Sequence, residues 1–305
     1  YVSKMIKNLE SNFKNIQLRI RNDFELLESS KNSNISNDTW KRKEGGGGNT
    51  FVIANGNFFD NCAVNFSSIY GKKLPSSALA NTLKIDVKNG YHAMGVSVIS
   101  HPKNPYIPSS HMNVRLFGIL NKDGLINNWW IGGGYDLTPF IPINEDVIEW
   151  HQAAKEVLSP INKGFYKKFS NNCNKYFEIP HRNERRGVGG IFFDNLSSLS
   201  LENSMKMLNS VAFAYLNSYL KIANKRKKTK YTKVEKEFQL IRRGRYAEFN
   251  LIYDRGTAFG LQSNGRIESI LASLPSDVKW SYKKDKNYKL MEKKLLKMIN
   301  RDWNV

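Results

Sequence analysis

The most informative pattern in this sequence lies in residues 91–140, YHAMGVSVISHPKNPYIPSSHMNVRLFGILNKDGLINNWWIGGGYDLTPF. They hold three of its five histidines, an arginine, a Trp-Trp pair and a triple glycine that an aspartate soon follows. Residues 92–100 are apolar, small and partly β-branched, and residues 111–120 alternate between polar and apolar side chains. The stretch therefore predicts two strands joined by a proline-rich connection.

The second of these strands has two chemically different faces. Because successive side chains of a strand point to opposite sides, the polar side chains of residues 111–117 share a face. They are His111, Asn113 and Arg115. A proton carrier, an amide and a guanidinium lined up on a stiff element predict a site for an anionic ligand. The alternative interpretation, a solvated strand face, is the more common origin of such a pattern.

Three further features favour the site. Ser97 and His101 share a parity on the preceding strand, so both would face the same cleft if the two strands pair. Asp136 follows Gly132-Gly133-Gly134, where a sharp backbone turn could bring its carboxylate close to a ligand. Trp129-Trp130 and the glycines suit a wall for a flat ligand. A simple β-turn is the alternative interpretation of the glycine run.

These residues resemble the family of oxygen-dependent coproporphyrinogen III oxidases. The matching blocks are GVSVISHPKNPYIPSSHMNVR (95–115), WWIGGGYDLTPF (129–140), HRNERRGVGGIFFDNL (181–196) and RRGRYAEFNLIYDRGTAFGLQSNGRIESILASLP (242–275). EGGGGNTFVIANGNFFDNCAVNFS (44–67) is similar to the family's early block. The resemblance runs from about Trp40 to Trp280 in the family's order, and blocks of this length make it specific.

The resemblance implies an enzyme of haem synthesis. It would convert two propionates of coproporphyrinogen III to vinyl groups with molecular oxygen, giving protoporphyrinogen IX, and would need no cofactor beyond oxygen. Three residues would be catalytic: His111 as proton donor, Asp136 beside the pyrrole nitrogens, and Arg115. The substrate contacts carried over from the family are Ser97, Asn113, Val114, Arg115, Asp254, Arg255, Asn264, Gly265 and Arg266. Asn264 stands where the family more often has glycine or serine, so a backbone contact is expected there.

A divalent metal is the open point of this resemblance. His101, His111, His151 and His181 match positions described as metal ligands in some bacterial members. The spacing of 10 between the first two runs through a proline-rich loop and is not a zinc or non-haem iron signature. We favour no metal, with His101 and His181 contacting the substrate or the residues that hold it.

We expect one catalytic domain over residues 1–305 with an α+β fold, because strands outnumber βαβ alternations. The resemblance likewise implies a broad, mainly antiparallel β-sheet flanked on both faces by α-helices. Apolar spacing predicts an N-terminal amphipathic helix over residues 1–28 that docks on the body of the protein. A polar, glycine-ending loop over residues 29–50 then leads to the catalytic body over residues 51–305.

Within the body, the pattern predicts a hairpin, a strand and two helices: residues 51–69, 245–254, 201–222 and 284–299. Asn55-Gly56 is the turn signal of the hairpin, and Ser263 to Arg266 reads as a turn. Residues 246–281 match the family's dimer segment, so the resemblance implies a homodimer. We expect an exposed strand edge in this segment to make the contact.

The formal net charge of +20 raises the possibility of nucleic-acid binding. The lysines are scattered, however, and the dense cluster at residues 225–230 follows a predicted helix, so we expect no nucleic-acid partner. A positive field also suits an acidic substrate. Two rival classes remain: a metal-dependent oxygenase or hydrolase acting on another acidic small molecule, and a basic nucleic-acid-binding module.

No apolar run reaches the roughly 18 residues that a membrane span needs, so we expect a soluble protein. Cys62 and Cys173 have no metal spacing and are expected to be free thiols in a reducing compartment. The sequence begins at Tyr1, and any native leader is absent from it. We expect a cytoplasmic location, with the mitochondrial intermembrane space, which some members of the family occupy, as the alternative.

Overall fold

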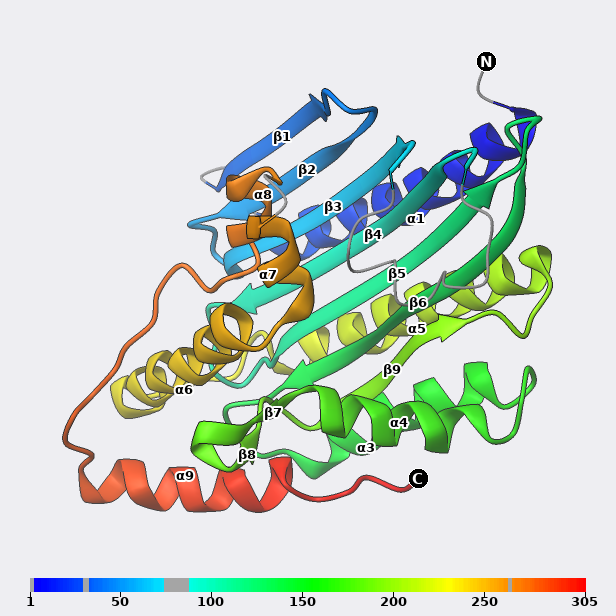
Figure 1. Ribbon diagram of the computed structural model, residues 1–305. Helices are drawn as coiled ribbons and strands as arrows, with labels where there is room; N and C mark the ends of the chain where they lie inside the picture. Colours follow the sequence, from blue (N-terminus) through cyan, green and yellow to red (C-terminus); the bar gives the residue numbers. More distant parts are fainter. Residues whose placement is uncertain (1–2, 30–32, 74–87, 263–264) are drawn as a thin grey trace.

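A computed structural model describes residues 3–29, 33–73, 88–262 and 265–305 (Figure 1). Its frame is a seven-stranded antiparallel sheet in the order β1-β2-β3-β4-β5-β6-β9. The strands are β1 Asn34–Lys41, β2 Gly46–Ala54, β3 Phe59–Gly71, β4 Tyr91–Pro102, β5 Ser109–Leu120, β6 Ile126–Thr138 and β9 Gly189–Leu196. A separate two-stranded sheet pairs β7 Glu178–Ile179 with β8 Glu184–Arg185.

The helices described are α1 Lys4–Glu28, α3 Asn144–Leu158, α4 Phe165–Tyr176, α5 Leu201–Arg226, α6 Lys233–Ile252, α7 Arg255–Gln262, α8 Ile267–Leu271 and α9 Lys286–Ile299. The predicted α+β class is therefore confirmed, as are the hairpin made by β2 and β3 and the two helices that correspond to α5 and α9. Among the described residues, no helix combines the length and apolar character that crossing a membrane requires.

One face of the sheet is covered by α1 and α5, which lie behind it in Figure 1. Ser3 caps α1 by accepting a hydrogen bond from the Ile6 N–H, and the predicted apolar stripe of this helix is buried in the core. From α5, the hydroxyls of Tyr215 and Tyr219 meet strand hydroxyls of the same face. The predicted docking of the N-terminal helix on the body is confirmed.

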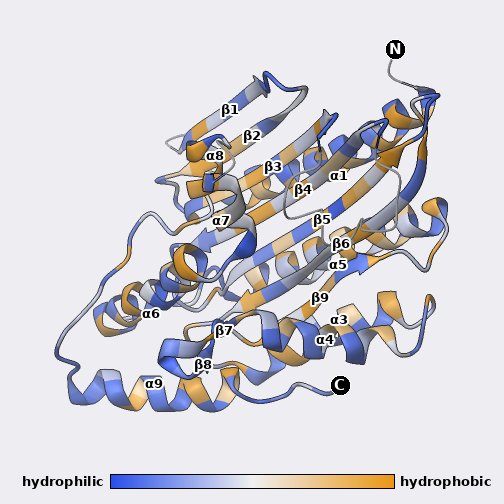
Figure 2. Ribbon diagram, in the orientation of Figure 1, coloured by the Kyte–Doolittle hydropathy of each residue, from blue (hydrophilic) through white to orange (hydrophobic). Residues whose placement is uncertain are grey.

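The described helices cover the opposite face of the sheet only in part. Helices α6, α7 and α8 lie in front of one end of the strands, and none of the described helices lies over the middle of β4, β5 and β6 (Figure 1). Orange and blue segments alternate along the central strands in Figure 2, as expected for strands with one core face and one polar face. The helices thus flank both faces of the sheet, and the unequal cover creates room for a site.

The prediction of a loop over residues 29–50 is wrong for most of its length. Strand β1 and the first residues of β2 lie there, and residues 30–32 fall outside the described part of the chain. Gly48 shows why the glycine run belongs to a strand: a Cβ on it would lie 2.3 Å from the Phe66 carbonyl oxygen and 2.5 Å from the Trp40 ring. The glycines let β1, β2 and β3 approach one another closely.

The predicted strand over residues 245–254 is also wrong, because residues up to Ile252 belong to α6. This helix begins at a capping box, in which Thr232 and Glu235 satisfy each other's backbone N–H groups. The described residues of the 246–281 segment contain no strand, so a dimer contact through a strand edge there is wrong as well. Of the turn predicted from Ser263 to Arg266, the first two residues lie outside the described chain.

Candidate active site

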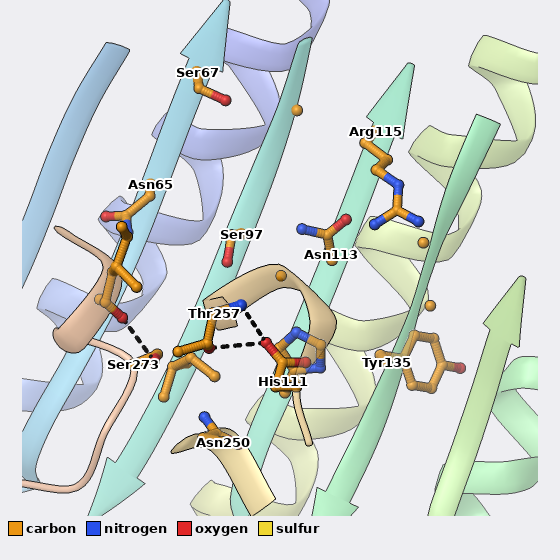
Figure 3. A pocket seen from close by; sticks show the side chains of 18 of the residues that line it. Asn65, Ser67, Ser97, His111, Asn113, Arg115, Tyr135, Asn250, Thr257 and Ser273 are labelled. Atoms are coloured by element: carbon orange, nitrogen blue, oxygen red, sulfur yellow. Dashed lines mark hydrogen bonds between the residues drawn. The ribbon is translucent and has the colours of Figure 1, made fainter. Parts of the chain in front are cut away.

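A cavity of about 400 Å³ opens on the face of the sheet opposite to α1 and α5. Its bottom is formed by residues of β3, β4, β5 and β6, and its walls come from α4, β9 and the α6–α8 segment. Figure 3 shows the polar side chains of three neighbouring strands lying side by side beneath Thr257 of α7. The cavity is thus built on rigid strands and walled by helices.

The strand register places polar groups in one row across the cavity. Asn65 of β3 pairs with Ser97 of β4, which pairs with Asn113 of β5, which pairs with Gly134 of β6. Their neighbours His111 and Arg115 lie two residues away on either side of Asn113 (Figure 3). The structure therefore brings together Ser97 and the three polar residues of β5, whereas His101, which shares the parity of Ser97, is buried and does not line the cavity.

Beside this row the bottom of the cavity consists of glycines, here called the glycine floor: Gly95, Gly133 and Gly134. The last two have φ values of +155° and +140°, and Cβ atoms on them would lie 2.3 Å from the Asn113 carbonyl oxygen and 2.0 Å from that of Ile191. Both lie inside β6, so the β-turn interpretation of the glycine run is wrong, and no sharp turn precedes Asp136. These three positions therefore add no side chain to the bottom of the cavity, and the Asn113 and Arg115 side chains of β5 lie between Gly95 and the two glycines of β6.

His111 and Asp136 form the centre of the site. They are partners in the sheet register, and the ring Nδ1 of His111 lies 2.8 Å from Asp136 Oδ1. Arg186 donates two hydrogen bonds from Nη2 to the same carboxylate, at 3.0 and 2.8 Å. Burial opposes ionisation of Asp136, but Arg186 and His111 outweigh it and hold the pKa of its carboxyl below the ordinary value. The carboxylate is therefore ionised.

The ionised carboxylate fixes the tautomer of His111. An ionised carboxylate can only accept, so Nδ1–H of His111 donates to Asp136. Nε2 is then the nitrogen that can exchange a proton, and among the described residues it has no hydrogen-bond partner. His111 lines the cavity and Asp136, only 2% exposed, does not. The pair can present a proton acceptor or donor to a ligand.

Arg186 is a site residue to which the sequence analysis gave no role. Its guanidinium carbon lies 4.1 Å from the ring centre of Phe177 and 4.4 Å from that of Tyr246, and Nη1 donates to Asn250 Oδ1 at 2.7 Å. Burial disfavours its charge, but Asp136 outweighs burial and raises the pKa of Arg186. One sequence feature could have indicated this role: Arg186 belongs to the HRNERRGVGG block and directly precedes the glycines that lead into a buried strand.

Aromatic rings form the wall on the β9 side of the cavity. Tyr176 and Phe192 stack with their centres 4.3 Å apart and their planes at 12°, and Phe177 lies beside them. The Trp-Trp pair, by contrast, does not line the cavity: Trp130 stacks on Phe117 further along the same sheet. The predicted flat wall therefore exists, but other aromatic residues make it.

Arg115 lines the cavity and pairs with Asp194 of β9, its Nη2 lying 2.7 Å from Oδ1. Arg255, the first residue of α7, approaches the same carboxylate at 3.8 Å. Asp254 lines the cavity and caps α7 by accepting hydrogen bonds from the N–H and hydroxyl of Thr257. Two of the predicted arginines thus meet at Asp194, at the rim of the cavity, where Arg115 is a lining residue and Arg255 and Asp194 are not.

The remaining predicted contacts do not reach the cavity. The Val114 side chain is fully buried on the face that α1 and α5 cover, so only its backbone lies near the polar row. Gly265 and Arg266 are not among the lining residues, and Arg266 donates to Asp38 of β1 at 2.9 Å. Asn264 lies outside the described residues.

The four histidines proposed as alternative metal ligands lie in separate hydrogen-bond networks. His101 is bound to the Ser109 hydroxyl and the Ser273 carbonyl, and burial lowers its pKa to about 3. His151 meets the Val188 carbonyl, and burial lowers its pKa to about 4. His181 contacts Tyr253 and Glu248. Within the described part of the chain, no group of three or more His, Cys, Asp or Glu residues gathers to hold a metal ion.

Comparison with known protein families gives a match over nearly the whole chain. A family model described as Coproporphyrinogen III oxidase matches residues 8–304. The matched range includes every strand of the sheet and every residue that lines the cavity.

Proposed function

Since the chain belongs to the coproporphyrinogen III oxidase family, we propose that the cavity over β3–β6 is its active site. The enzyme oxidatively decarboxylates coproporphyrinogen III to protoporphyrinogen IX in haem synthesis. The observation that carries the proposal is the juxtaposition of the glycine floor with the polar row and the His111–Asp136 pair. A broad tetrapyrrole can lie on such a floor while its carboxylates reach charged groups at the rim.

The reaction itself defines what the site must do. In each propionate the bond to the carboxyl carbon breaks, a hydrogen leaves the methylene attached to the ring, and a double bond forms between the two methylene carbons. Each vinyl group therefore releases two electrons. The two conversions supply the four electrons that reduce one dioxygen to two waters, so the balance needs no oxidant besides oxygen. We accordingly assign the enzyme no further cofactor.

His111 is the residue we propose to exchange protons with the substrate. An electron-rich pyrrole reacts with oxygen more readily once its N–H is polarised or deprotonated. His111 lines the cavity, and because its Nδ1 is held by Asp136, its Nε2 is the atom that can act as the acceptor. Because Asp136 does not line the cavity, we infer that it acts through His111, by fixing the tautomer and orientation of the ring. Arg186 keeps that carboxylate ionised.

Arginine and amide groups are the proposed substrate contacts. Arg115 and Arg255 offer the planar fork that binds a carboxylate in a bidentate manner, which suits a propionate. The Asn113 Oδ1 atom is buried and has no hydrogen-bond partner among the described residues. A buried acceptor without a donor is unfavourable, so a pyrrole N–H is a fitting partner for it. Ser97, beside it in the register, supplies a second polar contact.

A homodimer is the assembly we propose, through the helices of the 246–281 segment. Leu251 and Ile252 at the end of α6 are 52% and 60% exposed, and Trp280, later in the segment, is 55% exposed. Exposed large apolar side chains within one segment favour a protein partner, and the family resemblance favours a second copy. Helix packing replaces the strand edge as the means of contact.

A cytoplasmic location remains our proposal, with the mitochondrial intermembrane space as the alternative. Cys62 and Cys173 are both buried free thiols, which is in keeping with a reducing compartment. Fractionation of the source cells, followed by detection of the protein, distinguishes the two compartments.

The decisive experiment is mass spectrometry of the product after the chelator-treated protein has been incubated with coproporphyrinogen III, in air and without oxygen. Loss of two carboxyl groups in air only is the expected result. Conversion that returns only when a divalent ion is added would contradict the metal-independent mechanism. A chain that leaves the substrate intact in every condition would contradict the proposed active site.

A further inference from the structure

A carboxylate of the protein already occupies the arginine pair at the rim of the cavity. Asp194 Oδ1 accepts a hydrogen bond from Arg115 Nη2 at 2.7 Å, and Oδ2 lies 3.8 Å from Arg255 Nη2. The backbone N–H of Asn195 donates to Oδ1 at 2.9 Å. Two guanidinium groups and one N–H therefore surround Asp194, and the same set of donors would suit a bound propionate.

This cluster joins two separate parts of the site. Arg115 comes from β5 at the bottom of the cavity, whereas Arg255 is the first residue of α7 and packs over the Tyr176 ring at 4.9 Å. Both arginine side chains are accessible, at 45% and 66% exposure, while Asp194 is 24% exposed. A ligand can therefore reach both arginines without unfolding either element.

We propose that Asp194 is a specificity residue that competes with the propionates of the substrate for Arg115 and Arg255. This inference rests on the proposed function of the cavity. A propionate that approaches the arginine pair meets a site whose charge Asp194 has already offset in part, and it is repelled by the Asp194 carboxylate. Each carboxylate that a ligand brings to the rim must outcompete this internal group.

The competition favours exchange of product for substrate. Coproporphyrinogen carries four carboxylates and protoporphyrinogen carries two, so the substrate has more groups that can displace Asp194 at the rim. A ligand that has lost two carboxylates competes less well, and Asp194 returns to the arginines as it leaves. We therefore predict that Asp194 lowers the affinity of the site for every ligand that carries carboxylates. The tetracarboxylate substrate should still bind more tightly than the dicarboxylate product.

The test uses binding of coproporphyrin III, the oxidised and fluorescent tetracarboxylate, because binding can be measured without turnover. Asp194→Asn keeps the shape of the side chain and an acceptor for the Asn195 N–H but removes the charge. We expect Asp194→Asn to lower the dissociation constant of coproporphyrin III by about threefold to tenfold. The affinity for its tetramethyl ester should not change, because the ester carries no carboxylate.

Asp302→Asn is the matched control, since Asp302 also pairs with an arginine at 2.8 Å, but its partner Arg185 does not line the cavity, whereas Arg115 does. It changes the net charge equally and should leave both affinities unchanged. In the double variant Asp194→Asn with Arg115→Gln, the gain in affinity should shrink. Asp194→Ser, which retains a hydroxyl acceptor, provides a second variant if Asp194→Asn does not fold, as judged by its thermal melt.

Weaker binding of coproporphyrin III by both folded Asp194 variants would overturn the proposal, because it would show that Asp194 positions the arginines instead of competing for them. An equal gain for acid and ester would overturn it as well. Failure of the proposed function would look different. The unaltered enzyme would then not turn over coproporphyrinogen, whatever the ratio of the affinities of variant and parent for coproporphyrin III.

Discussion

His111 and Asp136 are direct partners across β5 and β6, and the Nδ1–H of the imidazole donates to the carboxylate at 2.8 Å. Two stiff strands therefore set the orientation of the ring, and a buried charge sets its tautomer. A histidine held in this way loses little freedom when it meets a substrate, which is the condition for efficient proton transfer.

Replacement of His111 by glutamine should lower kcat at least about 100-fold, because the proton-exchanging Nε2 is lost. Binding of coproporphyrin III should change little, since the amide still fills the same space on β5. Turnover assays and fluorescence titration measure the two quantities. His181→Gln is the control: His181 does not line the cavity and should retain normal turnover. Equal losses in the two variants would contradict the proposed role.

Asp136→Asn should lower the free energy of unfolding by about 3–5 kcal/mol, because Arg186 is left buried without a charged partner. The pKa of Asp136 is lowered in the fold, so its stabilising contribution is present above the pKa of the unfolded state and is lost as pH falls through the folded value. The free energy of unfolding, measured with urea between pH 5 and 3, should therefore fall less steeply with pH for the variant than for the parent. Identical declines would argue against an ionised Asp136.

His101 and His151 should make the protein sensitive to mild acid. Their folded pKa values of about 3 and about 4 lie below the ordinary 6.5, so between pH 6.5 and 4 the unfolded state binds more protons. Stability then falls as pH falls, by about 1.4 kcal/mol per pH unit for each histidine. The free energy of unfolding, measured with urea, should differ less between pH 7 and pH 5 for His101→Gln than for the parent. An unchanged difference would count against a neutral, buried His101.

Leu251→Glu should shift the proposed dimer towards monomer, because a charge is placed on an exposed apolar side chain of the 246–281 segment. Sedimentation velocity at several protein concentrations measures the shift. Leu18→Glu is a matched control, since Leu18 is 51% exposed on α1 and lies outside that segment. A dimer that tolerates both substitutions would place the interface elsewhere.

The central strands could be predicted because their chemistry follows a period of two. Met112 and Val114 are fully buried while His111 and Asn113 line the cavity, which matches their opposite parities in the sequence. The same rule failed for residues 245–254, where a short alternation lies within α6. The helix was indicated further upstream, by Thr232 and Glu235 in the spacing of a capping box.

Other features could not be predicted from local pattern. Strand β1 is exposed along nearly all its length, so no alternation of apolar residues marks it. The burial of Arg186 depends on Tyr246, which lies far from it in the sequence, as well as on the nearby Phe177. The pairing of Asp194 with Arg115 likewise requires β9 to lie beside β6, and that neighbourhood is set by the order of strands and not by the residues themselves.

The glycine floor also limits how this enzyme can change by mutation. A Cβ on Gly95 would lie 2.8 Å from the Val114 carbonyl oxygen, and those on Gly133 and Gly134 would lie closer still to backbone oxygens, which cannot move aside as a side chain can. An alanine scan normally removes side-chain atoms, but at these glycines it would add a Cβ atom. We expect such variants to misfold. Drift or directed evolution towards other ligand shapes must therefore act on the helical and aromatic walls, and a variant library is best confined to those positions.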